Sequence, residues 1–249
     1  MKSPMRVLIV GGGVVGCSIA YFLSKRDVRV TVVEMGEIGG QASGAAAGLL
    51  APLRPLSEQD SFKALQLAGI SRFPSIVPEL EVASGISVSY QQTGTLRILP
   101  PEKLASARLW AETWRSAGYR IDVLTPAEAR AREPLLYPGL HGAVSIAEEA
   151  QVGPAQLVKA FALAARRAGA SIYDHTEVVA LERSESGDRI TGAWTRSGEL
   201  LGCDHLVIAA GTWSAKLGGV ARYAAPHPTG ARRDRRPPAT LHTTAQHYL

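Results

Sequence analysis

The 249-residue sequence predicts an α/β fold, and three observations near its start support this. Residues 5–10 are an apolar, β-branched run, which is typical of a buried parallel strand. A turn with the sequence Gly-Gly-Gly-Val-Val-Gly follows at 11–16, and residues 14–25 carry apolar side chains at a helical spacing. A second β-branched run, at 30–33, leads into Glu34. Strand, glycine turn, helix and strand in this order are typical of the Rossmann unit, which binds a dinucleotide.

The glycine turn and Glu34 predict how the dinucleotide is held. Gly11 permits the tight turn, Gly13 lets a pyrophosphate approach the backbone, and Gly16 lets the helix pack closely on the strand. The first N–H groups of the helix then face the phosphates. Glu34 comes eighteen residues after Gly16, where a carboxylate accepts hydrogen bonds from a ribose hydroxyl. A glycine turn without a ligand is the alternative, and the flanking strand and helix argue against it.

The segment that follows Glu34 bears on which dinucleotide is bound. Residues 36–52 are rich in Gly, Ala and Ser, so their backbone can lie close against a large flat ligand. An NAD site has no need of such a segment. A flexible linker has a similar composition, but a linker has no reason to follow a ribose-binding position directly.

Three stretches of the sequence resemble the FAD-dependent amino-acid oxidase superfamily. Ala-Ala-Ala-Gly-Leu-Leu at 45–50 resembles its flavin-contacting loop and is most similar to the glycine oxidase branch associated with thiamine biosynthesis. The other stretches are Thr-Pro-Ala-Glu-Ala-Arg at 125–130, with Glu-Pro at 133–134, and Leu-Val-Ile-Ala-Ala-Gly-Thr-Trp at 206–213. The resemblance covers about residues 5–218. It implies a Rossmann-type FAD-binding domain with an incomplete α+β substrate domain, and FAD as the cofactor.

The resemblance also implies which residues hold the cofactor. It places Val14 and Val15 against the pyrophosphate, and Ala42 and Ser43 facing the phosphates. Glu34 and Met35 lie at the adenosine ribose, and Val178 supplies a backbone contact to the adenine. Ala47, Gly48 and Leu49 line the flavin ring. Gly211 corroborates the site, although it is also explained as a glycine that ends a strand. The expected cofactor-binding residues are therefore Gly11, Gly13, Val14, Val15, Gly16, Glu34, Met35, Ala42, Ser43, Ala47, Gly48, Leu49, Val178 and Gly211.

The implied reaction is oxidation of the C–N bond of glycine or a related small amine or amino acid. The alternatives are a sarcosine oxidase-like or D-amino-acid dehydrogenase-like enzyme and a non-catalytic flavin-binding fragment. A substrate carboxylate favours a bidentate arginine. The resemblance places that arginine beyond the matching segment. Within the segment, Arg54 and Arg97 are the candidates for binding the carboxylate, and the alternative for each is a structural or surface charge. We therefore expect little oxidase activity from this chain, and no catalytic side chain is assigned.

The domain organisation follows from the order of the remaining patterns. We expect the FAD-binding domain at 1–80 and 150–219, and the partial substrate domain at 81–149. In the latter, residues 86–91 and 95–99, joined through Thr93-Gly94, predict a hairpin, and residues 101–117 a helix. The expected return to the first domain is a helix from Pro154 to Gly169 and strands at 170–174 and 178–182.

A capping box is predicted inside the partial substrate domain. Thr125 and Glu128 have the spacing at which each side chain bonds the other residue's backbone N–H. We expect a helix to begin there.

The last thirty residues change character. Residues 220–249 hold five arginines against one aspartate, so they carry +4 of the formal charge of +5 and show neither helical nor strand periodicity. We expect this tail to be disordered and dispensable, or read out of frame. A short, divergent family member with a disordered tail is an alternative. A basic arm for nucleic acid is another, which the scarcity of aromatic residues disfavours.

Composition limits the remaining possibilities. No apolar run approaches the length of a membrane span, and no signal peptide is evident, so we expect a cytoplasmic protein. The expected partner is a small amine or amino-acid substrate and not a nucleic acid; a homo-oligomer is possible, but the sequence does not give the oligomeric state. Cys17 and Cys203 form no C-x-x-C pair and are expected to be buried free thiols. His141, His175 and His205 are scattered, so no metal site is predicted.

Overall fold

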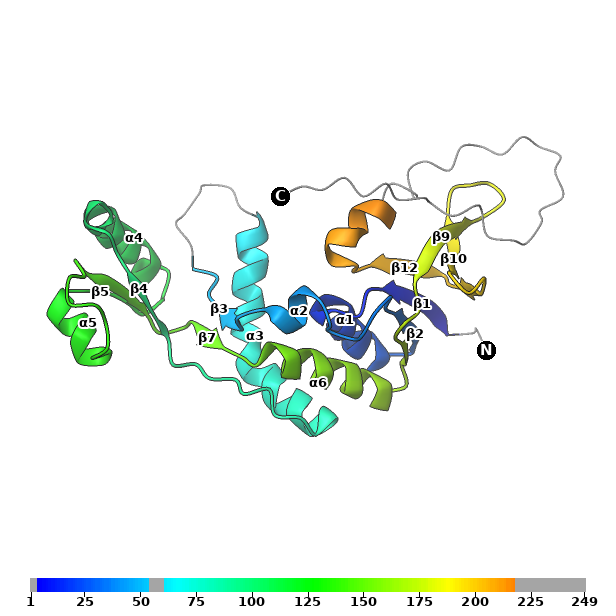
Figure 1. The fold of residues 1–249 in the computed structure, drawn as a ribbon, viewed down its shortest axis with the longest axis horizontal. Helices are drawn as coiled ribbons and strands as arrows, with labels where there is room; N and C mark the ends of the chain where they lie inside the picture. The colour runs from blue at the N-terminus through cyan, green and yellow to red at the C-terminus, as the bar shows by residue number, and fades with distance from the viewer. Residues whose placement is uncertain (1–3, 54–60, 218–249) are drawn as a thin grey trace. The chain divides into compact units, whose positions relative to one another are not determined.

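The computed structural model describes residues 4–53 and 61–217. Arg54 and the tail at 220–249 lie outside the described residues. The described residues divide into two compact units, of which the larger comprises residues 4–46, 80–86 and 154–217, and the smaller residues 47–53, 61–79 and 87–153 (Figure 1).

A four-stranded parallel sheet forms the centre of the larger unit, which confirms the predicted α/β fold. The glycine turn joins the first strand to helix α1, and the chain returns beside that strand as predicted. The sheet has the strand order β12-β1-β2-β8. Its elements are β1 (Met5–Val10), α1 (Val14–Ser24), β2 (Val28–Val33), β8 (Ser171–Tyr173) and β12 (His205–Ile208).

The two faces of this sheet are covered differently. On one face α1 packs against α6 (Pro154–Arg167), where the rings of Tyr21 and Phe161 lie 5.9 Å apart. On the other face lies an antiparallel sheet of β9 (Val178–Arg183), β10 (Ile190–Thr195) and β11 (Leu200–Gly202). Leu8 and Val10 of β1 pack toward Ala193 of that sheet. Burial on both faces explains why residues 7–10 of β1 are all apolar.

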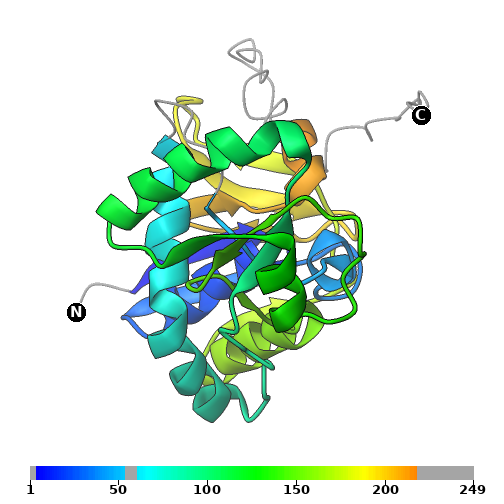
Figure 2. The same cartoon turned by 90° about the vertical axis from the view of Figure 1, so that its left-hand side faces the viewer.

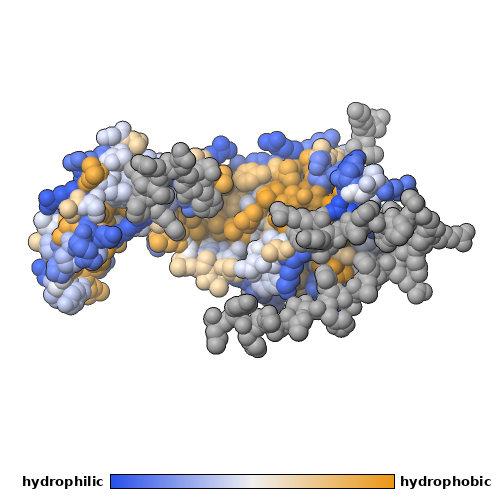
Figure 3. Space-filling view, turned by 90° about the horizontal axis from the view of Figure 1, so that it is seen from above, coloured by the Kyte–Doolittle hydropathy of each residue, from blue (hydrophilic) through white to orange (hydrophobic). Residues whose placement is uncertain are grey.

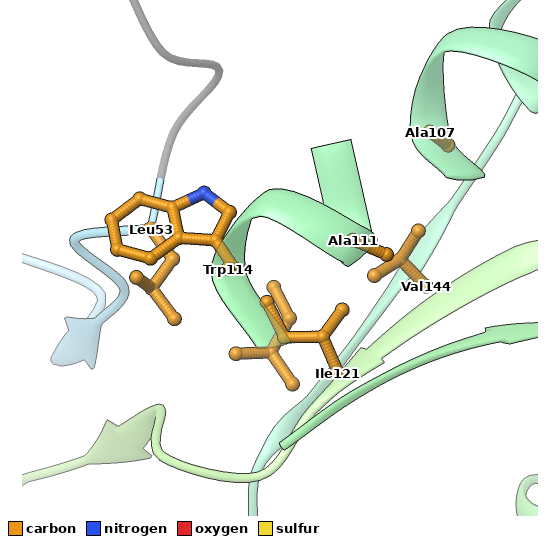
Figure 4. Close-up of a cluster of buried hydrophobic side chains, with 7 residues drawn as sticks. Leu53, Ala107, Ala111, Trp114, Ile121 and Val144 are labelled. Atoms are coloured by element: carbon orange, nitrogen blue, oxygen red, sulfur yellow. The ribbon is translucent and has the colours of Figure 1, made fainter. Parts of the chain in front are cut away.

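The smaller unit contains an antiparallel sheet of strand order β4-β6-β5 with a helix on each face (Figure 2). Alternate residues divide between the faces: Ile121 and Val144 join α4 in one cluster, and Leu124 joins α5 in the other (Figure 4). The elements are β4 (Thr95–Ile98), η1 (Pro101–Lys103), α4 (Leu104–Ser116), β5 (Ile121–Leu124), α5 (Pro126–Arg132) and β6 (Ala143–Ile146).

The predicted hairpin at 86–99 is wrong. Residues 86–90 form no strand, and Gln91 makes an isolated bridge with Gln151. Strand β4 pairs instead with β6, beginning with Thr95 opposite Ile146. Gly94 has φ of +76°, a conformation that favours glycine, but the strand that follows it pairs with a segment some fifty residues away in the sequence.

The remaining elements are short, apart from one long helix that no sequence pattern predicted. Helix α3 (Ser61–Ser84) contains Pro74 and Pro78, each of which removes a backbone donor from the helical ladder. The short elements are α2 (Ala42–Ala45), β3 (Leu49–Leu50), β7 (Ala150–Gln151) and η2 (Gly211–Trp213). In residues 4–53 and 61–217, no helix combines the length and apolar character that a membrane crossing requires.

The capping box is confirmed and gives a first prediction. The Glu128 N–H donates to Thr125 Oγ1 at 3.3 Å, and the Thr125 N–H donates to Glu128 Oε2 at 2.8 Å. Replacing Thr125 with alanine leaves one helical N–H without its acceptor, so we expect unfolding to become easier by about 1 kcal/mol. A denaturant midpoint equal to that of the parent protein would contradict this role.

Candidate functional site

A pocket opens at the carboxyl end of the parallel sheet, entirely within the larger unit. Its volume is about 480 Å³. Strand β1 has β2 on one side and β12 on the other, so its end is a topological switch point, where α/β sheets bind ligands. The space-filling view shows a broad area of exposed hydrophobic side chains (Figure 3), and pocket-lining Val15 is 57% exposed.

The three motif glycines have different structural roles. Gly11 has φ of +115°, and a Cβ there would overlap the Ala209 carbonyl group. A Cβ on Gly16 would overlap the Gly11 carbonyl oxygen, so both glycines are needed by the fold itself. Gly13 has an ordinary extended backbone, and a Cβ there would meet only Ser43 Oγ, at 3.1 Å. Gly13 lines the pocket, so its missing side chain leaves room for a ligand.

The first turn of α1 provides an anion-binding surface. Its N-cap is Gly13, which has no side chain to occupy the helix end. The Val14 N–H donates to Ser43 Oγ at 3.0 Å, and this bond connects the end of the glycine turn to the segment after Glu34. Backbone N–H groups and the helix dipole favour a phosphate at such an end, and the Ser43 hydroxyl adds a further donor.

Glu34 is held firmly at the end of β2. Its Oε2 accepts the Gly12 N–H at 2.7 Å, and its Oε1 accepts the Gly36 N–H at 3.0 Å. Each carboxylate oxygen has more than one acceptor position, so these bonds fix the orientation of the group and leave capacity for a ribose hydroxyl.

The opposite wall of the pocket includes an ion pair that the sequence did not reveal. Glu177 precedes β9, Arg196 follows β10, and both line the pocket with Lys216. Arg196 donates from Nε to Glu177 Oε2 at 2.6 Å and from Nη2 to Oε1 at 2.9 Å. These hydrogen bonds lower the pKa of Glu177 and raise that of Arg196. The one sequence signal for this site is that Glu177 directly precedes the strand predicted at 178–182.

The structure brings most of the expected cofactor-binding residues together. Those that line the pocket are Gly11, Gly13, Val14, Val15, Glu34, Met35, Ala42, Ser43, Val178 and Gly211. Gly16 is buried beneath the loop and lines no part of the pocket. Ala47, Gly48 and Leu49 belong to the smaller unit, where β3 pairs with β7.

Arg97, a candidate for binding a substrate carboxylate, is engaged elsewhere. Its Nη2 pairs with Glu149 Oε1, and its Nη1 donates to the Leu53 carbonyl oxygen. Glu149 is 0% exposed and also accepts the Leu53 N–H at 3.2 Å and the Thr95 hydroxyl. Arg97 therefore serves as the counter-charge of a buried carboxylate.

The remaining reactive groups are structural. Cys17 and Cys203 are free and buried, as expected. Burial, with a smaller contribution from the Glu34 charge, raises the pKa of Cys17 to about 12, so this thiol is a poor nucleophile. The described part of the chain has no group of three His, Cys, Asp or Glu side chains that could hold a metal ion.

Comparisons with known proteins agree with this geometry. The family model described as FAD dependent oxidoreductase matches residues 6–233. Glycine oxidase of Geobacillus kaustophilus is 35% identical over 214 residues, which are 85% of this chain and 56% of that protein. Glycine oxidase of Bacillus licheniformis is 32% identical over 219 residues, 87% of this chain and 57% of that protein.

The solved structures give the same result. The crystal structure of the Geobacillus kaustophilus glycine oxidase has a TM-score of 0.79 and 33% identity, and the match covers 88% of this chain and 59% of that one. This chain thus spans a little more than half the length of the curated relatives it matches.

Proposed function

The chain belongs to the family of FAD-dependent oxidoreductases, and from this premise we propose that its pocket binds FAD for the oxidation of glycine or a related small amine or amino acid. The observation that carries the proposal is a single pocket that contains the open Gly13 position, the first turn of α1 and the oriented carboxylate of Glu34. The glycine oxidase relatives support the choice of substrate, and the resemblance to their thiamine-associated branch supports a role in thiamine biosynthesis.

The proposed cofactor contacts divide into four sets. The pyrophosphate contacts Val14, Val15, Ala42 and Ser43, and the ribose contacts Glu34 and Met35. The backbone of Val178 contacts the adenine, and Gly211 also lines the pocket. The flavin ring contacts Ala47, Gly48 and Leu49. In this proposal the FAD-binding domain comprises residues 1–80 and 150–219 and the partial substrate domain residues 81–149. Residues 47–79 and 150–153 are then part of the FAD-binding domain, although they cluster with the smaller unit.

The residues of the chain supply position and electrostatics for this chemistry. Bound FAD would supply a hydride acceptor for the carbon next to the substrate nitrogen, which would convert the amine to an imine that water can hydrolyse. Ser43 Oγ accepts the Val14 N–H and can donate its own hydroxyl hydrogen to an anion at the end of α1, and the fixed Glu34 offers acceptors to a sugar. Arg97 is not assigned to the substrate carboxylate, because Glu149 holds it.

Cofactor retention and substrate preference test the proposal. Purified protein is expected to be yellow and to bind FAD in preference to NADPH. Flavin reduction is then followed without oxygen, with glycine, sarcosine and D-alanine compared at equal concentration. The order of rates is informative even when turnover is slow, and we expect glycine to be fastest. Tight binding of NADPH with no binding of FAD would overturn the cofactor assignment, and a strong preference for sarcosine or D-alanine would overturn the substrate.

A further inference from the structure

The ion pair between Glu177 and Arg196 joins the ends of two strands at the wall of the pocket. Besides the two side-chain bonds, the Arg196 N–H donates to the Glu177 carbonyl oxygen at 2.8 Å. Three hydrogen bonds therefore connect the residue before β9 to the residue after β10. They act beside an irregularity in the β9–β10 ladder, whose register shifts between Trp194 and Thr195.

This connection bears directly on Val178. Val178 follows Glu177, lines the pocket, and pairs with Thr195 at the shifted end of the ladder. On the other side of Glu177, the Thr176 N–H donates to the Glu34 carbonyl oxygen at 2.7 Å. The main chain at 176–178 is thus held at Thr176 by the Glu34 carbonyl oxygen and at Glu177 by Arg196.

The pair has little other use. The Arg196 and Glu177 side chains are 61% and 39% exposed, and ion pairs of that exposure contribute little to global stability. A bidentate arginine nevertheless restricts the geometry of its partner. A pocket wall that is already ordered also avoids an entropic cost when a ligand binds.

We infer that Arg196 is a positioning residue, which acts through Glu177 to hold the Val178 backbone ready for the adenine ring and so favours ligands that carry adenosine. The inference rests on the proposed FAD site. It predicts that the pair affects the adenosine half of the cofactor and leaves the flavin half untouched.

The test measures dissociation constants of the apoprotein for FAD, ADP and FMN, of which FMN lacks adenosine. Arg196→Ala is expected to weaken FAD and ADP about tenfold and to leave FMN and the melting midpoint unchanged. Glu177→Ala should weaken them as much, and the double variant no more than either single variant, because the two residues act as one unit. Arg196→Lys should restore only part of the affinity, since lysine lacks the planar fork.

Arg6→Ala is the matched control. Arg6 pairs with Asp204 at 3.1 Å, and their side chains are 49% and 41% exposed. Arg6 belongs to the same unit but lies near the amino end of β1, so its loss should leave FAD affinity unchanged.

Several outcomes would overturn the inference. FAD bound equally well by the parent protein and Arg196→Ala would do so, as would an equal loss of FMN, which would indicate a general loss of structure. If Arg196→Ala weakened FAD and Glu177→Ala did not, Arg196 would contact the ligand directly. A parent protein that bound neither FAD nor ADP would refute the proposed function itself, which distinguishes that failure from this one.

Discussion

A Gly13→Val protein is expected to fold normally and to lose FAD. Gly13 has an extended backbone that any residue can adopt, and the nearest atom to a new Cβ is Ser43 Oγ. The fold therefore loses only about 1 kcal/mol, for a poorer N-cap. The branched side chain would instead occupy the pocket at the end of α1, where the phosphate is proposed to lie. We expect FAD affinity to fall at least a hundredfold, about 2.7 kcal/mol.

Three control variants separate binding from folding. Gly13→Ala adds a single carbon and should give an intermediate loss of affinity. Gly69→Val adds the same side chain at an exposed position of α3, where a Cβ meets nothing within 4 Å, and should retain FAD. Gly16→Val should fail to fold, because its Cβ overlaps the Gly11 carbonyl oxygen. A Gly13→Val protein as yellow as its parent would show that the pyrophosphate lies elsewhere.

A Glu149→Ala protein is expected to lose about 3–5 kcal/mol of unfolding free energy, which is typical when one partner of a buried ion pair is removed. The substitution leaves Nη2 of Arg97, the hydroxyl of Thr95 and the N–H of Leu53 without their acceptor. Leu53 is 1% exposed and packs in the cluster that contains Trp114 (Figure 4), so water reaches its N–H poorly. Denaturant unfolding, followed by circular dichroism and tryptophan fluorescence, measures the loss.

The adjacent glutamate provides the control for this prediction. Glu148 also pairs with an arginine, Arg120, at 3.0 Å, but the Arg120 side chain is 78% exposed. Solvent screens such a pair, so Glu148→Ala should cost about 1 kcal/mol or less. Similar losses in the two variants would mean that burial of the carboxylate is not what makes Glu149 important.

Sequence alone could predict the features that depend on short stretches of chain. The unit from β1 to Glu34 needs only one strand, one turn, one helix and one further strand, each with its own periodicity. The capping box at Thr125 likewise depends on residues three positions apart. The resemblance extended this to the cofactor and to the family, which the comparisons confirm.

Only the tertiary structure decided the pairings between distant segments. The turn at Gly94 has the sequence of a hairpin turn, yet β4 pairs with β6, because sheet pairing depends on packing that no local pattern records. The partners of Arg97 and Arg196 were hidden for the same reason. Arg97 meets a glutamate 52 residues away and Arg196 one 19 residues away, and charge alone does not indicate which acid each arginine reaches.

The three motif glycines illustrate the same division within one turn. The sequence predicted that Gly11, Gly13 and Gly16 share a turn of the kind that binds dinucleotides, since their spacing and the flanking elements are local. The structure decided that Gly11 and Gly16 are required by close backbone contacts, whereas Gly13 leaves space in the pocket. The physical reason is that the need for a glycine depends on the atoms that a Cβ would meet. For Gly11 and Gly13 folding brings those atoms from Ala209 and Ser43, far along the chain, and for Gly16 from the folded turn itself.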